Sequence, residues 1–393
     1  MILRPQTKRH RLALAAAIVF VVIAAAMIVF HGWDHLRAAA FLLRMQNLQN
    51  PGLLARAFES PLDETLTSIP TPSGPLRARL YVPRNNPHPP GMVVVHGLHH
   101  LGIDEPRLVA FARSLSATGI QVLTPELPSL ADYHIDRASA DLIGYSARAL
   151  ANSVGRKVGV LGLSFAGGLG LIAAADPRFA PCMNFVVSVG AHDDLERVSQ
   201  FLASNRIPRP DGSVLEMPAH EYGALILIYL HLEDFFPASD VPAARETLQL
   251  LLWERVEDSR KSAEQLSPAS RQKMELLFAH HREAFTGEIE QAIARHHAEM
   301  APVSPHGQLG GLQVPVFLLH GSEDNVIPPS ELFWLKQDVP RRVLKAALIS
   351  SVFSHVDMEA KSRFADTLQI VHFMAQVFEM TDAAGPITGK CGP

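Results

Sequence analysis

The sequence predicts an α/β fold in which a mostly parallel sheet is covered by helices on both faces. Short, wholly apolar strands alternate with helices between about residues 63 and 192, and the alternation resumes at about residue 312. Strands of that kind are typical of parallel sheets, which are buried on both faces. The interval 193–311 is rich in helical patterns with almost no strand signal. An insertion of that length is expected to form a structured subdomain.

The first elements of the predicted core form an antiparallel hairpin, because two strand-like runs flank a turn sequence at Thr71-Pro72-Ser73-Gly74. The expected strands are 66–69, 76–82, 92–95, 120–123, 158–161, 185–189, 314–319 and 343–349. The expected helices between them are 106–118, 138–153 and one that starts directly after Ser164. This order keeps most crossovers helical, as a parallel sheet requires.

The insertion is expected to be a helical cap. Its clearest helical patterns are 222–236, 242–257, 268–285 and 288–300. Ser267-Pro268 has the residues preferred at an N-cap and at the first helical position. Gly307, Gly310 and Gly311 then make a plausible hinge back to the sheet.

The N-terminal region predicts a membrane anchor. The 19 residues from Leu12 to Phe30 carry no charged or polar side chain. As a helix they would be about 28 Å long, close to the hydrocarbon thickness of a bilayer. Arg4, Lys8, Arg9 and Arg11 precede the run, so we expect a cytoplasmic N-terminus and an extracytoplasmic catalytic domain. Cleavage as a signal peptide, which would secrete the chain, is the alternative.

The chain therefore divides into five parts. They are an N-terminal anchor (1–33), a juxtamembrane helical segment (34–62), the α/β core (63–192 and 312–380), the helical cap (193–311) and a disordered tail (381–393). The segment 34–58 either lies along the membrane surface or packs on the core.

Composition excludes several classes of protein. Of the 393 residues, 48% are hydrophobic and 19% are charged, which indicates a folded, well-buried chain. The formal net charge of −4 gives no basic footprint, so nucleic acid is not an expected partner. Two cysteines, Cys182 and Cys391, do not make a disulfide framework.

Residues 157–168 are the most informative segment. The strand 158–161 enters a tight turn at Gly162-Leu163-Ser164-Phe165-Ala166, and a helix of small residues follows. Such a turn requires small neighbours two positions either side of the serine, and Gly162 and Ala166 meet that requirement. A serine pushed out at the end of a strand is a candidate nucleophile, although Ser164 could also cap the helix.

A serine nucleophile needs a base and an acid that orients the base. In open α/β sheets, reacting groups gather at the carboxyl ends of the strands. Asp324 lies in the turn after strand 314–319, and His355 lies in the loop after strand 343–349. Asp324 is therefore the candidate acid and His355 the candidate base; Asp193 and Asp194, which also follow a strand, are alternative acids.

The oxyanion of an acyl transfer needs two backbone N–H donors. Phe165 supplies one at a helix N-terminus, where negative charge is stabilised. Leu98 is the natural second donor, because it follows strand 92–95 and Gly97 allows a close backbone approach. His99 and His100 invite a metal site, but no carboxylate-rich ligand set accompanies them. We therefore predict no metal and no cofactor.

These residues together resemble the α/β-hydrolase superfamily, and in particular serine esterases and lipases with a helical cap. The resemblance covers about residues 63–380. It depends on His96-Gly97, the Ser164 elbow, His320-Gly321-x-x-Asp324 with Ile327-Pro328, and Ser354-His355, in that order. It implies that Ser164 is the nucleophile, Asp324 the acid, His355 the base, and Leu98 and Phe165 the oxyanion donors. Ala166 departs from the pattern, which has a second glycine there.

The function expected from the resemblance is hydrolysis of a carboxylic ester through an acyl-enzyme. The apolar run 224–230 in the cap favours a small-molecule substrate with a hydrophobic acyl or alkyl group, although packing of the cap explains it equally well. A serine peptidase or amidase, or an acyltransferase of the same fold, is an alternative. A catalytically silent, membrane-tethered binding protein is another.

Overall fold

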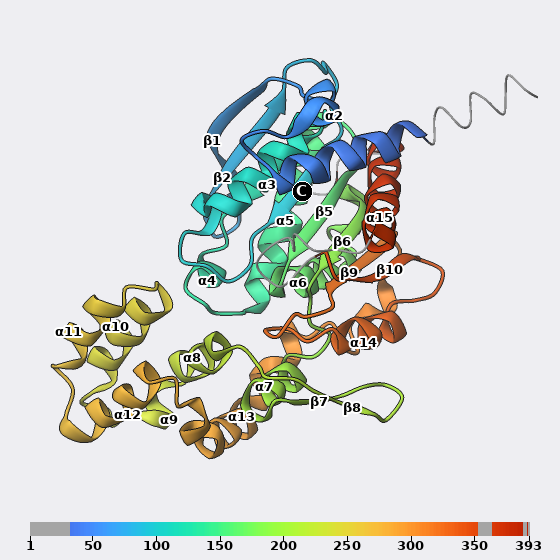
Figure 1. The fold of residues 1–393 in the computed structure, drawn as a ribbon. Coiled ribbons are helices and arrows are strands. Elements are labelled where there is room, and N and C mark those ends of the chain that lie inside the picture. The colour runs from blue at the N-terminus through green and yellow to red at the C-terminus, as the bar shows by residue number, and fades with distance from the viewer. Residues whose placement is uncertain (1–31, 353–363, 388–390, 392–393) are drawn as a thin grey trace, which may run out of the picture.

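The computed structural model describes residues 32–352, 364–387 and 391 (Figure 1). Its centre is an eight-stranded sheet. In spatial order the strands are β1 (Leu62–Thr71), β2 (Gly74–Pro83), β4 (Gln121–Pro125), β3 (Gly91–Val95), β5 (Val158–Leu163), β6 (Met183–Val189), β9 (Val316–Gly321) and β10 (Leu344–Ser350). From β4 to β10 every neighbouring pair is parallel, and only β2 pairs antiparallel with its neighbours. The predicted mostly parallel sheet is confirmed.

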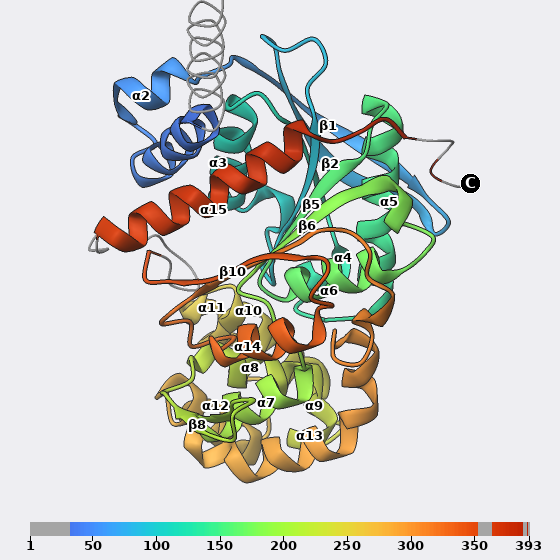
Figure 2. The ribbon, with the colours of Figure 1, turned by 90° about the vertical axis from the view of Figure 1, so that its right-hand side faces the viewer.

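Helices cover both faces of the sheet (Figure 2). On one face, α5 (Arg137–Val154) and α6 (Phe165–Ala175) pack on alternate strand residues such as Val93, Val160 and Val186. On the other face, α3 (Pro106–Ala117) and α15 (Phe364–Asp382) pack on the intervening residues, including Val94 and Val187. Because successive strand residues point to opposite faces, strands buried on both sides must be apolar throughout, as β3 is.

The segment before the sheet packs on the core. A helix spans residues 32–46, and α2 (Gly52–Ala57) follows it. Phe41 is buried against Phe111 and Phe378, with ring centroids 5.4 and 6.1 Å apart. Arg37 forms an ion pair of 2.7 Å with Asp382 at the end of α15. The packing alternative for this segment is therefore the one that the structure shows.

The predicted membrane-spanning run, Leu12 to Phe30, lies outside the described residues. Among the helices of the described ranges, none combines the length and the apolar character that crossing a bilayer requires.

The insertion between β6 and β9 forms a helical layer beneath the carboxyl edge of the sheet (Figures 1 and 2). Its elements are α7 (Leu195–Ser204), β7 (Arg206–Pro208), β8 (Val214–Glu216), α8 (Glu221–Leu230), α9 (Leu232–Phe235), α10 (Val241–Leu252), α11 (Val256–Ala263), α12 (Pro268–Phe278) and α13 (Thr286–Met300). The hairpin β7–β8 was not expected from the sequence. The cap has its own hydrophobic cluster, which also contains Phe165 and Ile327 of the core. Cap and catalytic edge therefore share one apolar interior.

Residues 381–387, expected from the sequence to be a disordered tail, lie against the core. Arg156 Nε donates to the carbonyl of Ala384 (3.1 Å), and the N–H of Lys157 donates to the carbonyl of Gly385 (3.1 Å). Cys391 is 2% exposed and belongs to the same apolar cluster as Cys182. Both thiols are free, and burial followed by contact with Cys391 raises the pKa of Cys182 to about 12.

Candidate active site

Ser164 occupies the turn between β5 and α6, as the sequence predicts. Its backbone has φ 56° and ψ −134°, a conformation that residues other than glycine rarely adopt. The Ser164 N–H donates to the carbonyl of Val189, and the Gly167 N–H donates to the carbonyl of Ser164, both at 2.8 Å. A strained serine fixed at the carboxyl edge of a sheet is the geometry of a nucleophile elbow.

Close packing explains why the residues around Ser164 are small. A Cβ atom added to Gly162 would lie 2.3 Å from the carbonyl oxygen of Ala166, so only glycine fits at this position. Ala166 is fully buried inside the turn. Alanine is therefore accommodated where the family pattern has its second glycine.

The loop after β3 lies directly against the serine. A Cβ atom added to Gly97 would be 3.1 Å from Ser164 Cβ and 3.7 Å from Ser164 Oγ. The structure thus brings the segment that carries Leu98 beside the candidate nucleophile. Phe165 follows Ser164 and begins α6, so its N–H lies at the positive end of the helix dipole. Both predicted oxyanion donors flank Ser164.

His96 holds the peptide that carries the Leu98 N–H. Its Nδ1 lies 2.7 Å from the carbonyl oxygen of Gly97, and its Nε2 accepts a hydrogen bond from the N–H of Leu127 at 3.0 Å. Nε2 as acceptor leaves the proton on Nδ1, which donates to Gly97. In a trans peptide, the carbonyl of Gly97 and the N–H of Leu98 point in opposite directions. Fixing the carbonyl of Gly97 therefore also fixes the direction of the Leu98 N–H, the candidate oxyanion donor.

The ring of His96 is suited to this task because it stays neutral. His96 is 2% exposed, and burial lowers its pKa from the ordinary value. In the sequence, His96 is part of the His96-Gly97 motif, but no local pattern indicates a role for its side chain. Only the contacts with Gly97 and Leu127 reveal one.

The cap also contacts this loop. The hydroxyl of Tyr222, near the start of α8, donates to the carbonyl of Leu98 at 3.2 Å. The Tyr222 ring meets that of Tyr133 edge to face, with centroids 5.8 Å apart. Leu98 is therefore fixed from the core through His96 and from the cap through Tyr222. The sequence offered no signal for Tyr222, because the contact joins residues 124 positions apart.

Asp324 lies in the turn after β9 and is 1% exposed. Its Oδ1 accepts hydrogen bonds from the N–H groups of Val326 (3.0 Å) and Ile327 (2.9 Å). His320 Nε2, which donates to the carbonyl of Ile327 at 2.8 Å, lies 3.4 Å from Asp324 Oδ2. Backbone donors thus fix a buried carboxylate in one orientation, as an acid that orients a base requires.

His355, the candidate base, lies outside the described residues. The strand that precedes it in the sequence, β10, is described and pairs in parallel with β9. Backbone hydrogen bonds connect the carboxyl ends of neighbouring strands: Ser164 to Val189 (2.8 Å), Gly190 to Leu319 (2.8 Å) and Ser322 to Ser350 (3.0 Å). The elbow, the acid turn and the start of the segment that carries His355 therefore share one edge.

The alternative acids are engaged elsewhere. Asp194 caps α7 by accepting from the N–H of Arg197 at 3.0 Å. Asp193 Oδ2 accepts from Arg197 Nη2 at 2.8 Å. Both alternative carboxylates therefore bind Arg197 at the start of α7, and Asp324 remains the candidate acid.

A cavity of about 780 Å³ lies between the cap and the catalytic edge. Phe165 and Val326 contribute its core side, and Leu202, Leu227 and Met300 are among its apolar cap residues. Ile135, Leu195, Ile226, Leu230 and Val303 add further apolar lining. Polar side chains also line the cavity, among them Asp132, His134, Arg137, His231, His296 and Glu299. The cavity therefore has a mixed lining of apolar and polar side chains that includes Phe165, the candidate oxyanion donor.

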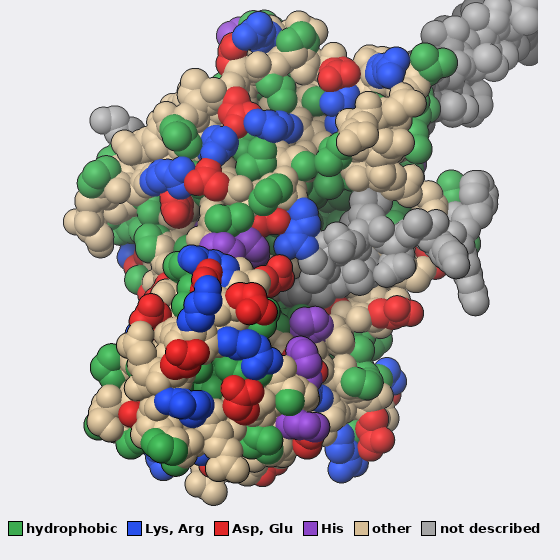
Figure 3. Space-filling view, turned by 60° about the vertical axis from the view of Figure 1, so that its left-hand side comes forward, with side chains coloured by type: hydrophobic (Ala, Val, Ile, Leu, Met, Phe, Trp, Pro, Cys, Tyr) green, Lys and Arg blue, Asp and Glu red, His purple; other side chains and the backbone are tan. Residues whose placement is uncertain are grey.

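His99 and His100, and several histidines of the cap, contact other side chains. His99 stacks on His100 and His100 on Trp253, with centroids 4.8 and 5.1 Å apart. His280 is exposed and pairs with Glu221. His296 stacks on His231 with centroids 3.8 Å apart. On the face that Figure 3 shows, basic and acidic side chains of the described residues are interspersed.

Comparisons by sequence give no relative, since no family model matches the chain and no curated protein matches it. Comparison with solved structures finds several matches. An esterase of Pyrobaculum calidifontis is 16% identical, covers 88% of this chain and 90% of its own, and gives a TM-score of 0.43. A second match is the 2-hydroxy-6-oxo-6-phenylhexa-2,4-dienoate hydrolase of a Rhodococcus species, which is 16% identical. The match covers 82% of this chain and 100% of that chain, with a TM-score of 0.41.

Dipeptidyl peptidase 4 of Porphyromonas gingivalis also matches, at 11% identity and a TM-score of 0.44. The match covers 84% of this chain and 38% of that one. Because these TM-scores lie below 0.5, the fold is assigned from its own features. The sheet order, the single antiparallel strand β2 and the elbow after β5 make it the α/β-hydrolase fold that the sequence predicts.

Proposed function

We propose that this chain is a serine hydrolase that cleaves a carboxylic ester through an acyl-enzyme. The observation that carries the proposal is Ser164, held at φ 56° with the Gly97 loop packed against its side chain. Backbone strain at a residue other than glycine is typical of functional sites. The buried, backbone-held carboxylate of Asp324 at the same edge supports a triad over a lone serine.

In the proposed reaction, His355 accepts the proton of Ser164 Oγ as the oxygen attacks the ester carbonyl carbon. The N–H groups of Leu98 and Phe165 stabilise the oxyanion, and Asp324 orients the imidazole and stabilises its charged form. The tetrahedral intermediate collapses, and the alcohol leaves with the proton from His355. A water molecule, deprotonated by His355, then hydrolyses the acyl-enzyme and restores Ser164.

The proposed substrate carries an apolar acyl or alkyl group. The cavity beside Phe165 supports this, because Leu202, Leu227 and Met300 would bury such a group next to the reacting carbonyl. Esters of graded chain length test the proposal. We expect kcat/KM to rise with chain length until the apolar region is filled.

Labelling with a fluorophosphonate probe, together with p-nitrophenyl ester hydrolysis, tests the nucleophile. We expect the wild type to be labelled and active, and Ser164→Ala to lose both properties while keeping its circular dichroism spectrum. Ser213→Ala, in the exposed β7–β8 hairpin, is the matched control and should behave as the wild type. An unlabelled, folded wild type would favour the binding-protein alternative, and a fully active Ser164→Ala would refute the assignment.

Ester cleavage is also distinguished from the alternatives within the fold. Matched amide and ester substrates separate an esterase from a peptidase or amidase. Adding acceptor alcohols separates hydrolysis from acyl transfer, because a transferase would give the new ester in place of the free acid.

The N-terminal run supports a further part of the proposal, a single-pass anchor with the catalytic domain outside the cytoplasm. Nineteen apolar residues after a basic segment favour that orientation. Membrane fractionation with N-terminal sequencing tests it. A mature chain that starts near residue 27 would show cleavage and secretion.

A further inference from the structure

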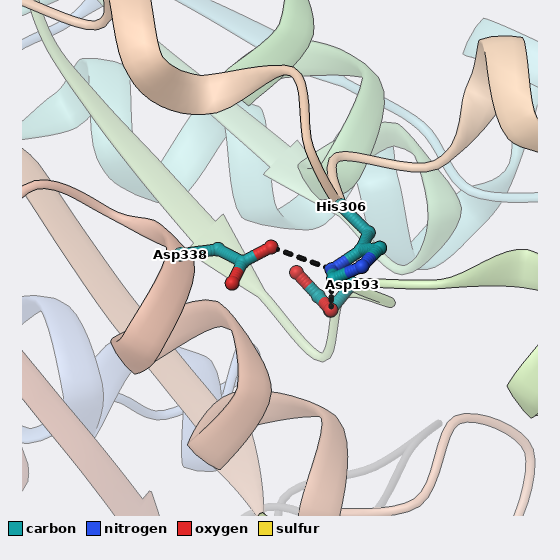
Figure 4. A group of neighbouring side chains, drawn as sticks. All are labelled: Asp193, His306 and Asp338. Atoms are coloured by element: carbon teal, nitrogen blue, oxygen red, sulfur yellow. Dashed lines mark hydrogen bonds and ion pairs between the residues drawn. The ribbon is translucent and has the colours of Figure 1, made fainter.

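Asp193, His306 and Asp338 converge at the point where the cap joins the core (Figure 4). Asp193 follows β6, His306 lies in the segment that returns from the cap, and Asp338 is the last residue of α14 (Ser330–Asp338). His306 Nδ1 lies 2.7 Å from Asp338 Oδ2 and 3.6 Å from Asp193 Oδ2. One potential ligand atom from each residue lies within 4.8 Å of the other two.

The carboxylate of Asp193 is incompletely satisfied. Asp193 is fully buried, and its Oδ2 accepts from Arg197, but its Oδ1 has no hydrogen-bond partner among the described residues. A buried, unpaired carboxylate oxygen is costly. In Figure 4, the Asp193 oxygen without a dashed line faces the space between Asp338 and His306. That oxygen therefore points into the cluster.

The carboxylates at the cluster carry more negative charge than Arg197 neutralises. The guanidinium of Arg197 serves two carboxylates, Asp193 at 2.8 Å and the fully buried Glu331 at 2.6 Å. Asp338 adds a third carboxylate, and it stands at the C-terminus of α14, where the helix dipole disfavours negative charge. One divalent cation would balance the two charges that Arg197 leaves uncompensated.

We propose that Asp193, His306 and Asp338 bind one Zn²⁺ ion. One imidazole nitrogen with two carboxylate oxygens is a donor set that zinc accepts, whereas Ca²⁺ and Mg²⁺ prefer oxygen ligands alone. The His306 side chain is 54% exposed, so solvent reaches the cluster and water can complete the coordination. The set escaped the sequence analysis because its members lie 113 and 32 positions apart.

The closest pair of ligand atoms requires only a small adjustment. Tetrahedral zinc with ligands at about 2.1 Å places the ligand atoms about 3.4 Å apart. His306 Nδ1 and Asp338 Oδ2 would therefore separate from 2.7 Å by less than about 1 Å as Nδ1 gives up its proton. The ligands are already oriented: the N–H of His306 donates to the carbonyl of Asp193 at 2.9 Å, and Arg197 holds Asp193 Oδ2.

The ion would act as a structural clip. Asp193 and His306 lie on the two chain segments that connect the cap to the core, and Asp338 ends the helix after the acid turn. Joining the three would stabilise the cap connections. The proposal does not depend on the reaction at Ser164. Its test therefore measures zinc binding and thermal stability instead of activity.

Zinc binding to the full chain is measured after chelation and dialysis, by calorimetry and by metal analysis. We expect one equivalent bound, and at a hundredfold excess over Kd a rise in Tm of about 3 °C for a chain of this size. Co²⁺ in place of zinc should give visible absorption bands of a nitrogen- and oxygen-ligated site. His306→Ala and, separately, Asp338→Asn should lose the equivalent, the Tm shift and the bands.

His281→Ala is the matched control, because His281 is an exposed histidine beside a carboxylate, Glu283, outside the cluster. It should bind zinc as the wild type does. Two results would overturn the proposal: a wild type that binds no zinc up to about 100 µM, or equal binding by the wild type and both cluster variants. Two variants are used so that misfolding of one does not decide the outcome.

Discussion

The hydroxyl of Tyr222 donates a hydrogen bond to the carbonyl of Leu98 at 3.2 Å, and this bond links the cap to the loop beside Ser164. The same loop is held from the core by His96, through the carbonyl of Gly97 at 2.7 Å. The two peptide units that flank Leu98 are thus fixed by different parts of the chain. If the Leu98 N–H is the oxyanion donor proposed above, its fixed direction matters, and the cap would then contribute by positioning as well as by enclosing the site.

We predict that Tyr222→Phe lowers kcat for an ester substrate by about three- to tenfold with little change in KM. Removing one neutral hydrogen bond costs about 1 kcal/mol. We expect this cost to weaken stabilisation of the transition state, because the Leu98 N–H would contact the charge that develops there, and so to lower kcat. Steady-state kinetics with a p-nitrophenyl ester measure the effect. Tyr145→Phe is the control; this tyrosine lies on α5, and its ring meets that of Phe179 edge to face. A change in KM alone would contradict a role in positioning.

A matched pair of glycines tests the packing of the elbow. Gly162→Ala should destabilise the fold by about 3 kcal/mol or more, because its Cβ would meet backbone at 2.3 Å and that backbone cannot move aside. Gly170→Ala, within α6, would place its Cβ at 3.7 Å from Val160, an ordinary contact. It should stabilise the helix by about 0.5–1 kcal/mol. Urea unfolding measures both, and similar effects in the two variants would contradict the close approach at Gly162.

The core was predictable because its signals are local. Each parallel strand is a short apolar run, and the elbow places its small residues within five positions of one another, so composition and spacing identify both. Ser164, Leu98, Phe165 and Asp324 lie at the edge that the strand order predicts. His355 stays a prediction, because it lies outside the described residues.

The cap was less predictable because its helices end without the usual signals. The sequence predicts single helices over 242–257 and 268–285, but the structure interrupts them near Glu254 and His280, which have φ of 60° and 63°. A residue that ends a helix in the left-handed conformation is usually glycine or asparagine. Glu254 and His280 are neither, so the sequence does not indicate that a helix ends there. Contacts such as Tyr222 with Leu98 join distant segments, and periodicity carries no information about them.

The strain at Ser164 predicts a trade between stability and activity. Ser164→Gly should abolish ester hydrolysis and raise the free energy of unfolding by about 1 kcal/mol, because glycine adopts φ 56° without a Cβ penalty. Ser164→Ala should also abolish hydrolysis but keep the strain, so its stability should stay near that of the wild type. Urea unfolding of both variants separates them. Equal stabilities for Gly and Ala would show that the turn is unstrained.

The stacked pair His231 and His296 predicts a pH dependence of stability. Burial, followed by the charge of His296, lowers the pKa of His231 from 6.5 to about 4. Between these values the unfolded chain binds a proton at His231 that the folded chain does not. Unfolding therefore takes up about one proton, and this contribution to stability falls as the pH drops from 6.5 toward 4.

We expect His231→Asn to remove that proton uptake. Its free energy of unfolding should decline less steeply than that of the wild type between about pH 7 and pH 5, as measured by urea unfolding at several pH values. His281→Asn, at an exposed position outside the stack, should follow the wild-type slope. Parallel curves for the wild type and His231→Asn would mean that His231 is protonated in the folded protein. The stack on His296, with its partners Asp234 and Glu299 at 3.0 Å, would then hold an imidazolium.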